Sequence, residues 1–151
     1  MNRMFCALGL AVLVANPAAF GESTPPITYY VQLVWGTNQQ APERAPFRAV
    51  GQKLKRRLSR CFRWTNYWEI NSQAVTVAAG TVQKVTLSQD CKIEIQSTSS
   101  TTREVRLYRN DKLVRKSRAD VRSNGMSIHG GDTTADGAWF VVIRRDKPRY
   151  P

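Results

Sequence analysis

Histidine and cysteine are scarce in this chain, whose 151 residues include one histidine and three cysteines. Cys6 lies in the N-terminal apolar segment, which leaves Cys61 and Cys91 for the rest of the chain. Neither has a second cysteine or a histidine at the spacing of a metal site, and neither has the local partner of a catalytic nucleophile. The sequence therefore predicts no metal and no cofactor, and it favours a protein that is not an enzyme.

Long apolar runs are also missing, since none reaches the length of a comfortable transmembrane helix. The N-terminal run covers residues 4–15, follows Arg3 and precedes a stretch rich in small residues that ends at Gly21. This order is typical of a signal peptide. We therefore predict a signal peptide over residues 1–21 and a secreted or periplasmic protein whose mature chain has no transmembrane segment. The remaining residues, 22–151, are predicted to form a single β-rich domain.

Carboxylates are few, with 11 acidic side chains against 23 lysines and arginines and a net charge of +12. Removing the predicted leader takes away Arg3 and no acid, so +12 becomes +11. The excess is local, because the stretch from residue 44 to residue 68 has no carboxylate and eight cations: Arg44, Arg48, Lys53, Lys55, Arg56, Arg57, Arg60 and Arg63. Such a patch attracts polyanions or anionic lipid head groups.

The same stretch has the pattern of a helix. Phe47, Val50, Leu54, Leu58 and Cys61 recur at helical spacing, which predicts an amphipathic basic helix near the N-terminus of the domain. We predict a binding face for a polyanion, an anionic envelope surface or a protein partner, formed by Lys53, Lys55, Arg56, Arg57, Arg60, Arg63 and Trp64. The alternative is a structural helix whose cations are only solvated and whose aromatic neighbours belong to the core.

The rest of the chain alternates apolar and polar residues, as β-strands do. The pattern predicts strands over residues 27–35, 67–71, 74–78, 82–88, 91–96, 104–108, 113–117 and 138–144. The predicted fold is α+β but mostly β, an antiparallel sheet or β-sandwich of six to eight strands with one N-terminal amphipathic basic helix. The apolar run from Trp139 to Ile143 predicts a central strand covered on both faces. Residues 144–151 are predicted to be a loose basic tail.

The two remaining cysteines predict a disulfide. Cys61 lies on the apolar side of the expected helix, and Cys91 shares a strand face with Ile93 and Ile95. Both thiols are thus expected to face one core, and an exported chain with an even number of cysteines usually joins them. Two separate buried thiols are the alternative.

The single histidine gives the alternative function, a small secreted hydrolase. His129 lies between Ser127 and Asp132, so Asp132 could orient it as a base while Ser127 or a water attacks. The segment that starts at Asp132 also partly resembles a calcium loop, but its twelfth position is Ile143 instead of glutamate. The first hypothesis remains an exported non-enzymatic binding or accessory module.

Overall fold

A computed structural model describes residues 24–40, 47–122 and 125–151, and for Gly131 and Asp132 it describes the backbone alone. The predicted signal peptide lies outside these residues. The elements follow in the order β1 (Ile27–Thr37), β2 (Arg48–Ala49), α1 (Gln52–Cys61), β3 (Asn66–Val77), β4 (Val82–Thr86), β5 (Cys91–Ser97), β6 (Thr102–Arg109), β7 (Lys112–Asp120), β8 (Met126–Thr133) and β9 (Gly137–Arg144). In this part of the chain no helix is long and apolar enough to cross a membrane.

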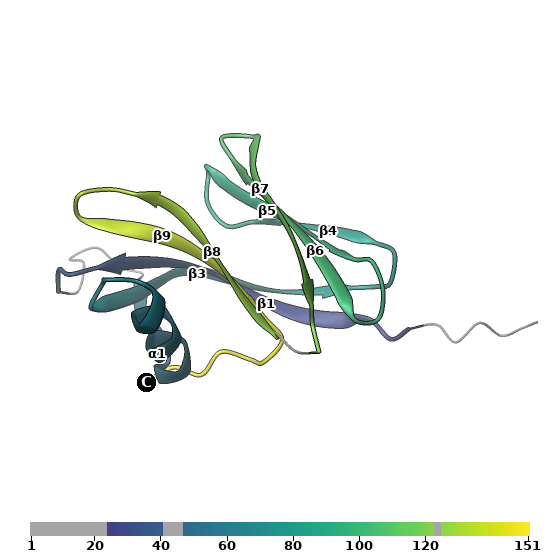
Figure 1. The fold of residues 1–151 in the computed structure, drawn as a ribbon, viewed down its shortest axis with the longest axis horizontal. Helices are drawn as coiled ribbons and strands as arrows, with labels where there is room; N and C mark the ends of the chain where they lie inside the picture. Colours follow the sequence, from purple (N-terminus) through teal and green to yellow (C-terminus); the bar gives the residue numbers. More distant parts are fainter. Residues whose placement is uncertain (1–23, 41–46, 123–124) are drawn as a thin grey trace, which may run out of the picture.

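The strands form two antiparallel sheets. The five-stranded sheet has the order β2-β3-β1-β9-β8, and the four-stranded sheet has the order β4-β5-β6-β7. Helix α1 lies on one side of the five-stranded sheet and the four-stranded sheet lies on the other (Figure 1). The mostly β, antiparallel architecture is confirmed. The helix is not N-terminal, because β1 and β2 precede it, and the described strands number nine instead of six to eight.

Two hydrophobic cores lie on the two faces of the five-stranded sheet. The inner core, between the sheets, includes Tyr29, Val31 and Leu33 of β1, together with Val141 and Ile143 of β9. The outer core, under the helix, includes Val34, Val50, Leu54, Leu58, Trp64, Tyr67, Phe140 and Val142. Alternate residues of β9 therefore enter opposite cores, which explains its continuous apolar run. The prediction of a strand covered on both faces is confirmed, with Trp139 half-buried against Trp35.

The helix starts later than its apolar pattern predicts. Arg48 and Ala49 pair with β3, and Gly51 is extended with ψ 156°, so α1 begins at Gln52. A Cβ added to Gly51 would lie 1.8 Å from the carbonyl oxygen of Arg149. The C-terminal segment thus passes against the start of the helix at a distance that only glycine allows.

The same segment is anchored, contrary to the prediction of a loose tail. The Tyr150 hydroxyl donates to Glu69 Oε2 at 2.8 Å, and the Arg48 guanidinium lies 3.5 Å from the centre of the Tyr150 ring. Glu69 is only 4% exposed and also accepts from Gln32 and Arg48. The anchor is a carboxylate on β3, far from the tail in the sequence, so local composition could not reveal it.

The predicted disulfide between Cys61 and Cys91 is absent, and both cysteines are free. Cys61 is exposed at the end of α1, on the outer side of the five-stranded sheet. Cys91 begins β5 and packs against the inner core, on the opposite side of that sheet. The prediction was wrong because it assumed one core, whereas the five-stranded sheet separates the two thiols.

Candidate functional site

The predicted basic face is exposed on α1. Leu54 and Leu58 are fully buried in the outer core, and this orientation turns the cationic side of the helix away from the sheet. Of the predicted binding residues, Lys55 is half-buried, and five cations are exposed: Lys53, Arg56, Arg57, Arg60 and Arg63. The structure therefore exposes five of the six predicted cations, four on α1 and Arg63 just after it.

Trp64, the seventh predicted residue, lies elsewhere. It is 6% exposed and belongs to the outer core, where its ring lies close to Gly36. The Arg63 guanidinium is 4.6 Å from the centre of the Trp64 ring. Trp64 therefore supports Arg63 from beneath and offers no open ring face on which a ligand could stack.

Most cations of this face have no acidic neighbour. Lys53 pairs with Asp146 at 2.8 Å, and Arg57 contacts the carbonyl oxygen of Met126. Within the described part of the chain no carboxylate lies within 4 Å of Lys55, Arg56 and Arg60 of α1 or of Arg63, which follows the helix. Their charge is therefore available to an external anion.

The C-terminal segment extends the basic face. Lys147 and Arg149 are exposed, and together with Lys53 and Arg56 they line a surface depression of about 790 Å³. We call this surface the cationic face: Lys53, Lys55, Arg56, Arg57, Arg60, Arg63, Lys147 and Arg149. Asp146 lines the same depression, and Arg144 and Lys53 hold the pKa of its carboxyl far below the usual range.

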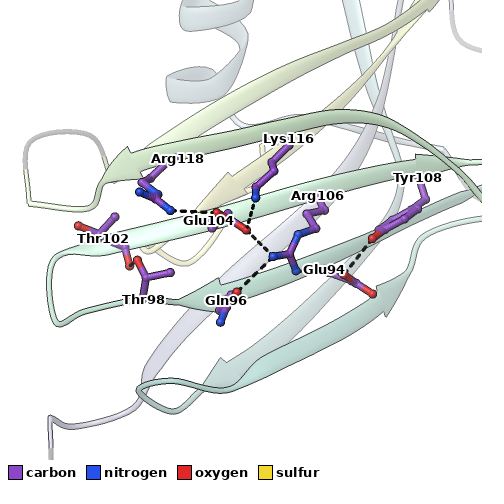
Figure 2. A network of polar contacts seen from close by, with 9 residues as sticks. All are labelled: Glu94, Gln96, Thr98, Thr102, Glu104, Arg106, Tyr108, Lys116 and Arg118. Carbon is purple, nitrogen blue, oxygen red and sulfur yellow. Dashed lines mark hydrogen bonds and ion pairs between the residues drawn. The ribbon is translucent and has the colours of Figure 1, made fainter.

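The outer face of the four-stranded sheet carries a second group of charges, but there they neutralise one another (Figure 2). Glu104, only 4% exposed, lies within ion-pair distance of Arg106, Lys116 and Arg118. Glu94 accepts from the Tyr108 hydroxyl at 3.0 Å and also pairs with Arg106. These carboxylates compensate the neighbouring cations, so this face is a poorer anion site than the cationic face.

The residues of the predicted hydrolase lie inside the sandwich. Ser127 Oγ and His129 Nε2 are 3.2 Å apart on β8, and Arg103 Nη2 donates to Ser127 Oγ at 3.0 Å. His129 is 4% exposed, and Arg103 is fully buried. The side chain of Asp132, the predicted orienting acid, lies outside the described residues.

The electrostatics of this cluster oppose general base catalysis. Burial, Arg115 and Arg103 lower the pKa of His129 to about 4. A histidine that removes a proton from serine must become an imidazolium, which two nearby guanidinium groups destabilise. Arg103 also donates to the hydroxyl that would have to attack. The arrangement therefore fits a structural polar cluster better than a nucleophile and its base.

No metal centre is evident in the described residues, which contain no group of three or more His, Cys, Asp or Glu side chains placed to share an ion. In the segment that resembles a calcium loop, Thr134 Oγ1 donates to Gly137 and the Asp136 carbonyl accepts from Thr37. These contacts are those of an ordinary turn into β9.

A cleft between the sheets was not predicted from the sequence. Its volume is about 330 Å³, and its apolar wall combines Leu33, Leu107, Trp139 and Val141 with the exposed Val114. The sheets diverge towards the turn that joins β6 and β7 (Figure 1), and Tyr108 and Arg109 at the end of β6 line the cleft. These residues come from four strands far apart in the sequence, so no local motif could indicate the cleft.

The chain matches no family model, no curated protein and no solved structure.

Proposed function

We propose that the protein is an exported, non-enzymatic binding module that contacts a densely anionic polymer or surface through the cationic face. The observation that supports this proposal most directly is the contrast between the two charged regions. On the outer face of the four-stranded sheet, Arg106, Lys116 and Arg118 surround the carboxylate of Glu104. On α1, by contrast, Lys55, Arg56 and Arg60 have no carboxylate within 4 Å among the described residues. Leaving like charges together without compensation costs stability, so the arrangement favours an external counter-charge.

The contact that this face supports is electrostatic, and it does not distinguish one nucleotide sequence from another. Trp64 is buried, and no large apolar side chain is exposed on α1. The face therefore has neither a platform for stacking nucleobases nor an apolar wedge for insertion into a bilayer. Lysine and arginine side chains would contact repeated phosphate, sulfate or carboxylate groups and release their counterions.

The first prediction is that binding to heparin, duplex DNA or anionic vesicles weakens steeply with salt and depends on α1. The slope of log affinity against log salt is negative. Replacing Lys55, Arg56, Arg60 and Arg63 with glutamine should make it shallower by about three to four. The measurement is binding at several salt concentrations, and comparing the three anions identifies the class that is preferred.

The matched control removes the same charge from the other layer. Lys84, Lys92, Lys112 and Lys116 are exposed on the four-stranded sheet, and replacing them with glutamine also removes four cations. If both quadruple variants lose affinity equally, only net charge matters and the cationic face is not a site. If neither loses affinity for any of the three anions, the proposal fails.

A further inference from the structure

We propose that the cleft between the sheets binds a small amphipathic anion, with an apolar body against the inner core and an anionic head group at Arg115. This inference does not rest on the proposed function, because the cleft and the cationic face belong to different layers. Ligand pockets are typically concave, mostly apolar and about 300 to 1,000 Å³ in volume. The cleft, at about 330 Å³, has that character.

The apolar part of the cleft fits the body of such a ligand. Leu33, Leu107 and Val141 form its deep wall and are 2 to 6% exposed. At its rim, Val114 is 56% exposed. Exposed aliphatic side chains beside an open core lose contact with water when an apolar molecule covers them, which favours binding.

The positive charge of Arg115 in the cleft favours a ligand with an anionic head group. Arg115 lies opposite Leu107 in the register of β6 and β7, lines the cleft, and has no carboxylate within 4 Å among the described residues. Arg109 and Asp90 line the same cleft. Two guanidinium groups and one carboxylate leave one net positive charge, which complements a monoanion. At about 30 Å³ per water molecule, the cleft has room for on the order of ten waters, which a small amphipathic molecule could replace.

Two cysteines provide a built-in assay for this site. Cys91 lines the cleft, whereas Cys61 is exposed at the end of α1 and reports on the cationic face. Burial raises the pKa of the Cys91 thiol, so it should react slowly with an alkylating reagent, and a ligand in the cleft should slow it further. Peptide mapping by mass spectrometry then follows both residues in one sample.

The probe is octanoate, compared with octanol and octylammonium, which share its chain but carry no charge or the opposite charge. We expect octanoate to slow alkylation of Cys91 and to leave Cys61 unchanged. Octanol should protect less well, by about tenfold in the concentration required, and octylammonium least. Equal protection by all three probes, no protection of Cys91, or equal protection of Cys61 would overturn the proposal.

A pair of variants tests the role of Arg115. Arg115→Gln should remove the preference for octanoate over octanol. Lys116→Gln removes the same charge from the adjacent residue, which points to Glu104 on the other face of β7, and it should keep the preference. Both positions are exposed, so the fold should tolerate either change. If the two variants bind octanoate equally well, Arg115 does not hold the head group and the proposal is wrong.

Discussion

Arg103 is a fully buried cation on β6 without a carboxylate partner among the described residues. It donates to Ser127, its guanidinium lies 5.0 Å from the centre of the Tyr29 ring, and its Nε and Nη1 atoms find no acceptor in the described part of the chain. A buried cation in such surroundings is costly. After burial and Arg115, its charge also contributes to lowering the pKa of His129.

The second prediction follows from His129. Its pKa is about 4 in the folded protein and about 6.5 when unfolded. The unfolded chain therefore takes up a proton first as the pH falls below 6.5, and the folded state loses stability between pH 6.5 and pH 4. From pH 7 to pH 5 the loss is about 2 kcal/mol. Denaturant melts at both pH values measure it.

A matched variant isolates this contribution. His129→Gln should remove most of the loss between pH 7 and pH 5. The pKa values of Glu94, Glu104 and Asp146 are lowered, so their protonation affects stability only below about pH 4.5. An unchanged pH dependence in His129→Gln would show that another group titrates in this range.

At the scale of elements, the start of α1 and the C-terminal segment depend on each other. Gly51 precedes the helix and touches Arg149, and Tyr150 reaches back to Glu69 on β3. The tail thus joins the start of the helix to β3 of the five-stranded sheet.

The third prediction concerns this junction. Gly51→Ala places a Cβ where the Arg149 carbonyl lies, so the tail must move and its contact with Glu69 weakens. We expect a loss of about 1 to 3 kcal/mol in the free energy of unfolding, measured in denaturant melts. Gly130→Ala is the control, because a Cβ there meets open space.

A double variant shows whether the cost arises at the tail. If Gly51→Ala acts by displacing Tyr150, adding Tyr150→Phe should cost less in the Gly51→Ala background than alone. Strict additivity would place the damage in the helix and not in the tail contact.

Sequence patterns identified the strands in which apolar and polar residues alternate along the chain. The predicted strand over residues 91–96 is β5, because apolar side chains alternate there and face one core. β8 was missed, since Gly130 and Gly131 interrupt any alternation and the segment becomes a strand only by pairing with β9. The predicted strands over residues 67–71 and 74–78 are one strand, β3, whose polar middle is held by β1.

At the scale of the whole molecule, the five-stranded sheet contributes to both cores. Sequence patterning showed which residues are apolar, but it could not show that they divide between two cores, and this caused the error on the disulfide. The same limit applies to the sites. The exposed cations of α1 followed from amphipathicity, whereas the burial of Trp64 and the cleft depend on packing between distant strands.

The fourth prediction is that both cores unfold together. Leu58→Ala in the outer core and Ile95→Ala in the inner core should each cost about 2 to 5 kcal/mol, because both side chains are fully buried. Tryptophan fluorescence and far-UV circular dichroism should give one coincident transition in each variant. Gln83→Ala, exposed on the same sheet as Ile95, should be nearly silent. Two separate transitions would show that the layers unfold independently.

The edge strand β7 has a consequence for the behaviour of many copies in solution. It is the last strand of the four-stranded sheet, and most of its residues are exposed. An open edge of this kind can recruit the same strand of another copy and begin aggregation. β7 carries four cations, Lys112, Arg115, Lys116 and Arg118, against one acid, Asp120. Glu104 pairs with Lys116 and Arg118, and the remaining excess of positive charge repels a second β7. Because salt screens this repulsion over about 10 Å at 0.1 M, the protein should self-associate more readily in concentrated salt.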